Sequence, residues 1–215
     1  MKRTRGKAVE RPARVARVAL TGGIATGKSH CLAVFKSAGA PVIDADQVAR
    51  DVVAPGSDGL AAVVKQFGKS VLLPNGQLNR AAMGMVIFAD PSARHKLEDI
   101  IHPRVFTAIE RWFAALTSPL GIADVPLLFE TSREEDFDIV VVAACRPDQQ
   151  LARLIARTHL SEADAQSRIA AQLPLADKVE RADYVIDTGG TKEQTESRTK
   201  AVWKKLQSEI GRGVS

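Results

Sequence analysis

Cysteine is scarce in this sequence, and its two copies, Cys31 and Cys145, are far apart in the chain. Neither belongs to a Cys-x-x-Cys motif or to a cluster with histidine, so nothing indicates a disulfide framework or a structural zinc site. We expect both to be free, buried thiols in a reducing cytoplasm. Hydrophobic residues make up 45% of the chain, enough for a full core without disulfides or a structural metal.

Long apolar runs are missing as well. The longest, such as residues 139–145, are far too short to cross a bilayer, and no apolar run follows the first charged residues. We therefore expect a cytoplasmic protein with no membrane partner and no secretory signal. Aromatic residues amount to only 5% and do not alternate with basic ones as in surfaces that stack exposed bases.

Acidic residues are rare at the amino end, although the whole chain carries a net charge of only +5. The first seventeen residues hold one acid, Glu10, against these bases: Lys2, Arg3, Arg5, Lys7, Arg11, Arg14 and Arg17. We interpret residues 1–14 as a solvated, poorly ordered leader, with nucleic-acid binding as the alternative. Because the remainder is nearly neutral, no nucleic-acid partner is expected.

Short apolar runs and glycines mark an α/β fold with a parallel sheet. Residues 15–21 have the composition of a buried strand, a burst of glycines follows, and helical periodicity covers residues 28–37 before a second strand at 41–43. This strand, loop, helix, strand order is typical of parallel sheets with right-handed crossovers. Further strands are predicted at 121–125, 139–144 and 184–186, and a last helix at 192–210.

Two helical stretches interrupt this alternation. The first, residues 48–116, contains one apolar stripe made of Leu97, Ile101, Val105, Ile109 and Phe113. Within it, Pro103 is expected to kink a helix or to start a new one after His102. The second stretch, residues 149–178, is helical and highly charged. We predict a substrate domain at 48–116, a lid at 149–178, and a nucleotide-binding core formed by residues 15–47, 117–148 and 179–211.

The motif that carries chemistry follows the first predicted strand. It matches the pattern G-x-x-x-x-G-K-[ST] in full, as Gly22-Gly23-Ile24-Ala25-Thr26-Gly27-Lys28-Ser29. Glycines let backbone N–H groups turn toward phosphates, and the helix that follows adds the positive end of its dipole. The ammonium group of Lys28 is expected to reach the β and γ phosphates, and the hydroxyl of Ser29 to bind Mg²⁺. The sequence therefore predicts a P-loop kinase that uses ATP.

Two acids, Asp44 and Asp46, follow the second predicted strand. Ligands of open parallel sheets bind at the carboxyl ends of the strands, so we expect both acids beside the phosphate loop. Either one is suited to accept the proton of an attacking hydroxyl or to hold water on the metal. Either is equally suited to cap the next helix, and spacing alone does not decide between these roles.

Charged residues elsewhere have two interpretations. Arg153, Arg157 and Arg168 fit surface pairs with acids such as Glu162 and Asp164, or a lid that closes on the transferred phosphoryl group. His102 fits a helix residue beside Pro103 or a substrate contact. Glu130, after the third long strand, fits a solvated loop or the site itself.

Taken together, these residues resemble the dephospho-coenzyme A kinases from about Arg17 to Trp203. The resemblance rests on ordered motifs: Leu20-Thr21-Gly22-Gly23-Ile24, Val42-Ile43-Asp44-Ala45-Asp46, Asn79-Arg80, His102-Pro103, Pro126-Leu127-Leu128-Phe129-Glu130, Gln150-Leu151-Ala152-Arg153-Leu154 and Ala182-Asp183-Tyr184-Val185-Ile186. It implies a three-layer αβα core with a five-stranded parallel sheet, a helical substrate domain and a helical lid. It also implies Mg²⁺-dependent transfer of a phosphoryl group from ATP to the ribose 3′-hydroxyl of dephospho-coenzyme A, the last step of coenzyme A synthesis.

The resemblance also implies roles for individual residues. Asp46 is expected to be the general base, Lys28 and Arg153 to act on the phosphates, and Asp44, Arg80 and His102 to bind the acceptor. ATP is expected to contact residues 23–30, namely Gly23, Ile24, Ala25, Thr26, Gly27, Lys28, Ser29 and His30. The oligomeric state is left open.

The sequence departs from the family pattern at three places. Ala25 stands where glycine is usual and fits if its φ is negative, and His30 stands where threonine is usual. The turn Asp187-Thr188-Gly189 replaces one that usually contains asparagine, which we expect to alter a contact near the adenine. Two other functions also fit the sequence: a P-loop kinase for nucleoside monophosphates, and a nucleotide switch or nucleic-acid-associated protein.

Overall fold

The computed structural model describes residues 14–212. Of the leader predicted for residues 1–14, all but the last residue lie outside this range. Arg14 is described, and its guanidinium group pairs with the carboxylate of Asp138 at 3.1 Å. The chain divides into two compact units, one formed by residues 44–114 and the other by the rest.

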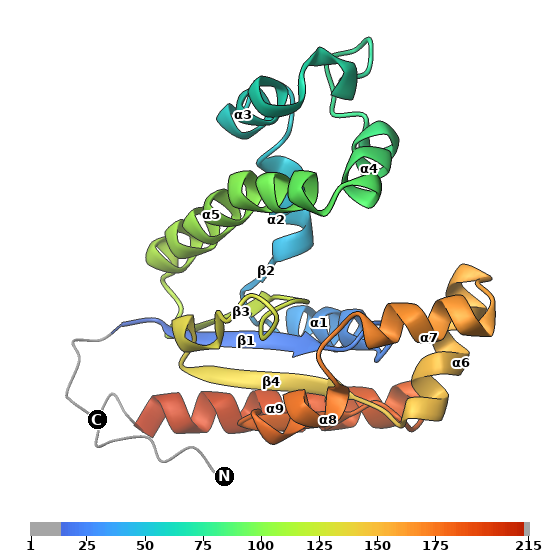
Figure 1. Ribbon diagram of the computed structural model, residues 1–215. Helices are drawn as coiled ribbons and strands as arrows, with labels where there is room; N and C mark the ends of the chain where they lie inside the picture. The colour runs from blue at the N-terminus through green and yellow to red at the C-terminus, as the bar shows by residue number, and fades with distance from the viewer. Residues whose placement is uncertain (1–13, 213–215) are drawn as a thin grey trace. The chain divides into compact units, whose positions relative to one another are not determined.

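A five-stranded sheet is the centre of the larger unit (Figure 1). Its strands lie in the order β2-β3-β1-β4-β5, and the pairs of β1 with β3, β1 with β4 and β4 with β5 are parallel. The strands are β1 (Ala16–Gly22), β2 (Val42–Asp44), β3 (Leu120–Asp124), β4 (Ile139–Ala144) and β5 (Tyr184–Asp187). Each begins and ends within one residue of its predicted position, so the predicted α/β class and parallel sheet are confirmed.

Two helices, α1 (Lys28–Ser37) and α9 (Lys192–Arg212), complete the core of this unit. Their apolar side chains join those of the sheet in one buried cluster. Phe35 of α1 meets Trp203 of α9 edge to face, with the ring centroids 6.3 Å apart. Burial of two aromatic rings fixes both helices on the sheet, because each ring removes a large apolar area from water.

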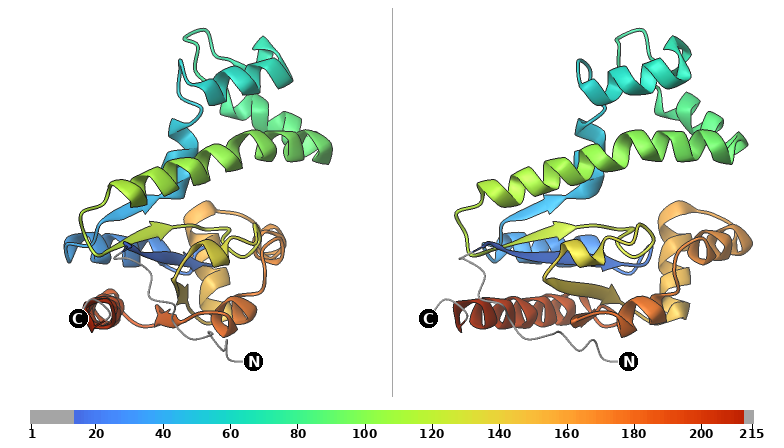
Figure 2. Two further views of the ribbon diagram at one scale, coloured as in Figure 1. Left: turned by 90° about the vertical axis from the view of Figure 1, so that its left-hand side faces the viewer. Right: turned by 60° about the vertical axis from the view of Figure 1, so that its left-hand side comes forward.

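The region predicted to be the lid contains three helices, α6 (Pro147–Thr158), α7 (Glu162–Ala170) and α8 (Leu175–Glu180). Pro147 begins α6, where a missing N–H is harmless, and the hydroxyl of Ser161 accepts a hydrogen bond from Asp164 N–H to cap α7. Figures 1 and 2 show α6 and α7 beyond the carboxyl ends of β1 and β4.

The unit of residues 44–114 is helical, as predicted. It contains α2 (Ala45–Asp51), α3 (Asp58–Phe67), the 3₁₀ turn η1 (Lys69–Val71), α4 (Arg80–Ala89) and nearly all of α5 (Pro91–Ala115). Within the described residues its one β feature is an isolated bridge between Leu72 and Leu78. The predicted apolar stripe is confirmed, since Val105, Ile109 and Phe113 are buried, while Leu97 and Ile101 pack against a second apolar cluster.

Pro103 lies inside α5, which continues as one helix on both sides of it. The expectation that a new helix starts after His102 is therefore wrong. A proline removes only its own N–H from the ladder, and the other hydrogen bonds of a long helix remain. Among residues 14–212, no helix is long and apolar enough to cross a membrane.

Candidate active site

The phosphate loop, residues 22–29, connects β1 to α1 at the point where the order of the strands reverses. The connection after β1 leads past β3 to β2, whereas the connection after β3 leads past β1 to β4, so the two run in opposite directions. A ligand crevice opens at such a point in a parallel sheet, outside the carboxyl ends of the strands. The fold therefore places the Gly-rich motif where a nucleotide is expected to bind.

The backbone of the loop is shaped by close packing at its start. A Cβ atom at Gly22 would lie 2.6 Å from the carbonyl oxygen of Ala143, so only glycine fits there. The buried hydroxyl of Thr26 donates to the carbonyl of Gly23 at 2.9 Å. The N–H groups of Gly27, Lys28 and Ser29 have no hydrogen-bond partner in the part of the chain that the structure describes. Three free donors at the positive end of α1 form a site for an anion.

Ala25 adopts a left-handed backbone with φ of 59°. From the sequence, alanine was expected to fit this position of the loop if its φ were negative, and this condition is not met. The turn of the loop at this position requires the conformation that glycine adopts freely, and a Cβ atom there costs about 1–2 kcal/mol.

We expect Ala25→Gly to leave the free energy of unfolding unchanged or to raise it by up to about 1 kcal/mol, because relief of strain offsets the greater freedom of the unfolded chain. Ala33, exposed within α1, is the matched control: Ala33→Gly should lower stability by about 1 kcal/mol. Urea unfolding of the two variants measures both values. Equal losses in the two would show that the backbone at Ala25 is not strained.

Lys28 forms an ion pair with Asp124, a residue that the sequence analysis missed. Asp124 ends β3, and its residue is only 3% exposed. β1 and β3 are neighbours in the register that sets Leu20 opposite Asp124, which brings the carboxylate to the phosphate loop. The signal in the sequence is an acid that ends an apolar strand. This signal could be interpreted only with the knowledge that β3 lies beside β1, the strand that precedes the phosphate loop.

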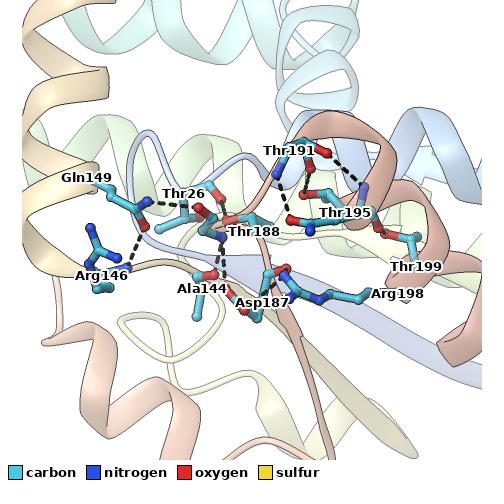
Figure 3. Close-up of polar contacts among 12 residues, drawn as sticks. Thr26, Ala144, Arg146, Gln149, Asp187, Thr188, Thr191, Thr195, Arg198 and Thr199 are labelled. Atoms are coloured by element: carbon cyan, nitrogen blue, oxygen red, sulfur yellow. Dashed lines mark hydrogen bonds and ion pairs between the residues drawn. The ribbon is translucent and has the colours of Figure 1, made fainter.

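Thr188, in the turn after β5, packs against the phosphate loop (Figure 3). Its hydroxyl lies within hydrogen-bond distance of the carbonyls of Thr26 and Ala144, at 2.5 and 3.0 Å, and the residue is 3% exposed. A Cβ atom on Gly27 would lie 3.4 Å from Thr188. The departure from the family pattern at this turn is thus accommodated by a buried contact with the phosphate loop.

Arg153 on α6 is held by the same turn. Its guanidinium group donates to the carbonyl of Thr188 at 2.7 Å and lies 3.4 Å from the hydroxyl. The predicted surface pairs with Glu162 and Asp164 do not form, because these acids bind Gln166 and Ser161 within α7 and its cap. The structure therefore brings Arg153 to the edge of the phosphate loop by way of Thr188.

Glu130 is exposed in the segment after β3, as one of the two interpretations expected, although its side chain is bound rather than free in solvent. Its carboxylate pairs with the ammonium group of Lys178 at 2.6 Å and accepts a hydrogen bond from the N–H of Leu173 at 3.1 Å. Lys178 is fully buried. The pair joins the segment after β3 to the end of the predicted lid.

Four predicted site residues belong to the unit of residues 44–114. Asp44 caps α2, since its Oδ1 accepts from the N–H groups of Asp46 and Gln47 at 2.8 and 3.3 Å. Asp46 is exposed on the first turn of α2, and its side chain takes no part in that cap. Arg80 is exposed at the start of α4, and His102 is half-buried in α5. Of the two acids, the structure therefore assigns the helix cap to Asp44.

The two cysteines are free thiols, with Cys31 buried and Cys145 half-buried. Burial raises the pKa of both thiols, and the charge of Arg153 opposes that rise in the pKa of Cys145. Both thiols are therefore protonated at neutral pH, and neither is an activated nucleophile. The ring of His30 lies 3.4 Å from the carbonyl of Lys192, at the start of α9.

Comparison with known proteins identifies close relatives. A sequence model of a family described as dephospho-CoA kinase matches residues 16–194. The chain is 43% identical to the dephospho-CoA kinase of Anaeromyxobacter dehalogenans over 91% of this chain and 94% of that protein. A crystal structure of a Thermus thermophilus protein matches 90% of this chain and 98% of its own, with a TM-score of 0.76 and 30% identity. The dephospho-CoA kinase of Campylobacter jejuni, 23% identical, has the same fold with a TM-score of 0.71 over 90% of this chain and 98% of its own.

Proposed function

The chain belongs to the dephospho-CoA kinase family, and from this premise we propose that it transfers the γ-phosphoryl group of ATP to the ribose 3′-hydroxyl of dephospho-coenzyme A, giving ADP and coenzyme A. The observation that carries the proposal is the phosphate loop between β1 and α1, with free N–H groups at Gly27, Lys28 and Ser29. ATP and dephospho-coenzyme A are its proposed partners. The cytoplasm is its proposed location, since ATP is abundant there and free thiols are usual.

Residues 23–30 are proposed to hold the phosphates of ATP. In the structure, the ammonium group of Lys28 pairs with the carboxylate of Asp124. Bound phosphates would attract this ammonium group and leave the carboxylate of Asp124 available for a cation.

Mg²⁺ fits the residues at this place. No group of three or more potential ligands among His, Cys, Asp and Glu occurs in the described residues. Mg²⁺ does not require one, since it is usually bound by one or two protein oxygens together with phosphates and water. The hydroxyl of Ser29 and the carboxylate of Asp124 are the proposed protein ligands. The ion would neutralise charge on the β and γ phosphates.

The acceptor hydroxyl must lose a proton as it attacks. Asp46 is the proposed base, because its carboxylate is exposed and the helix cap is already provided by Asp44. That cap occupies Oδ1 of Asp44, so a contact of Asp44 with the acceptor would use Oδ2. Arg80 and His102 are proposed to bind the acceptor through their donor groups.

We expect Asp46→Asn to lower kcat by about 10²-fold. Loss of a general base costs about 10²–10⁴-fold, and a loose phosphoryl transition state demands little proton transfer, so the low end applies. The control is Asp51→Asn at the end of the same helix, where the carboxylate of Asp51 accepts a hydrogen bond from the side chain of Gln47 at 2.8 Å. Recovery of the lost rate at high Mg²⁺ would assign Asp46 to the metal instead.

The function itself is tested by ADP release in a coupled assay with ATP and Mg²⁺. Dephospho-coenzyme A should stimulate ADP release, and mass spectrometry should find coenzyme A as the product. Nucleoside monophosphates are the alternative acceptors, and stimulation by these alone would contradict the proposal. ADP release that needs no acceptor would indicate a nucleotide switch.

A further inference from the structure

The two ends of the predicted lid, residues 149–178, are bound to the start of the phosphate loop. Near one end, the side-chain N–H of Gln150 donates to the carbonyl of Ile24 at 2.9 Å. Near the other end, Oε1 of Gln172 accepts a hydrogen bond from the N–H of Ile24 at 2.8 Å. Both polar groups of a single loop residue are therefore held by side chains of the lid region.

The contact with Gln150 depends on a glycine. A Cβ atom on Gly23 would lie 2.6 Å from Nε2 of Gln150, so any other residue would push the amide away. Gln150 is 5% exposed, which means that its hydrogen bond is not replaced by water when it breaks. The packing requires Gly23 to admit Gln150, in addition to the usual role of glycine near phosphates.

An ion pair between Glu130 and the buried Lys178 holds the residue next to Gln172. Leu173, the next residue, donates its N–H to the same oxygen of Glu130 that binds Lys178. Lys178 also lies 3.5 Å from the carbonyl of Gly22, the first residue of the loop. Burying an ammonium group is costly, and well-packed apolar side chains serve stability alone as well or better. The geometry thus indicates that the charge has a positioning role.

We propose that Gln150, Gln172, Lys178 and Glu130 are positioning residues that fix the start of the phosphate loop and couple it to the lid. They hold backbone groups of Gly22 and Ile24 at the start of the loop, so that the N–H groups of Gly27, Lys28 and Ser29 farther along it keep their direction. Preorganised donors need no reorientation when the nucleotide binds, which raises affinity and rate. The inference rests on the proposed function of the phosphate loop.

The first test is Gln172→Met, which keeps the length of the side chain and removes the acceptor. Exchange of the Ile24 amide proton, followed by NMR, should become at least about tenfold faster, and the affinity for a non-hydrolysable ATP analogue should fall about tenfold, as expected for one lost hydrogen bond. Gln166→Met is the matched control, since Gln166 binds only Glu162 within α7. It should change neither value more than twofold.

The second test removes both charges of the ion pair with Glu130→Gln/Lys178→Met. We expect the melting temperature to change by only a few degrees, because no unpaired charge remains, while the KM for ATP rises about tenfold. A merely structural pair would lower the melting temperature and leave the KM for ATP unchanged, and that result would overturn the inference. The inference would also be overturned if the Ile24 amide proton exchanged faster in Gln172→Met while the affinity for the ATP analogue stayed unchanged. Because analogue binding needs no acceptor, a wild-type protein inactive on dephospho-coenzyme A would refute the proposed function and leave this test intact.

Discussion

Lys28→Ala is expected to lower kcat/KM by on the order of 10³-fold, because the ammonium group neutralises charge on the β and γ phosphates as the phosphoryl group is transferred. The structure adds a second effect. Lys28 is the ammonium partner of Asp124, which is 3% exposed, so the variant should also lose about 1–3 kcal/mol of stability. Activity must therefore be measured on protein shown to be folded, by circular dichroism at the assay temperature.

Two control variants separate the effects on activity and stability. In Lys28→Ala/Asp124→Asn the charge of Asp124 is removed as well, so stability should recover while activity stays lost. Lys36→Ala changes an exposed lysine near the end of α1 and should leave both properties within about twofold or 0.5 kcal/mol of wild type. Normal turnover by folded Lys28→Ala protein would rule out a P-loop kinase.

Features of the fold and site that depend on neighbouring residues were predictable from the sequence. The strand before the phosphate loop, the glycines of the loop and the helix after it form one continuous segment, so periodicity and motif define it together. The apolar stripe of α5 is also local and is present in the structure, whereas spacing left open which of Asp44 and Asp46 caps α2, and the structure assigns the cap to Asp44. The same holds for the limits of all five strands.

Features that depend on distant segments were missed. Asp124 is recognised only when β3 is known to lie beside β1, and the sequence does not state that order. Lys178 was placed in a charged helical stretch and Glu130 in a solvated loop or the site, although the structure joins them in an ion pair with Lys178 fully buried. The positive φ of Ala25 is imposed by the turn of the loop, and alanine gives no sign of it.

Arg153→Ala is expected to lower kcat by on the order of 10³-fold and to change ATP affinity much less, if the arginine acts on the transferred phosphoryl group. Such an arginine meets charge that develops in the transition state, so its loss appears in kcat rather than in ground-state binding. In the structure its guanidinium group is bound to the carbonyl of Thr188, which in turn contacts the phosphate loop. Steady-state kinetics and binding of an ATP analogue measure the two quantities.

A loss of activity in Arg153→Ala has a second explanation, because Arg153 also contacts Thr188. Comparison of Arg153→Ala with Thr188→Ala distinguishes the two explanations. If Arg153 only holds the turn after β5, then Thr188→Ala should be as damaging as Arg153→Ala, since it removes the hydroxyl that joins the turn to the phosphate loop. If Arg153 acts on the phosphoryl group, Thr188→Ala should cost no more than about tenfold, the value of one hydrogen bond. Arg94 represents an ordinary surface arginine, because its side chain is 63% exposed and paired with Glu98. Arg94→Ala should leave kcat unchanged. A loss below about fivefold in Arg153→Ala would place Arg153 in that class.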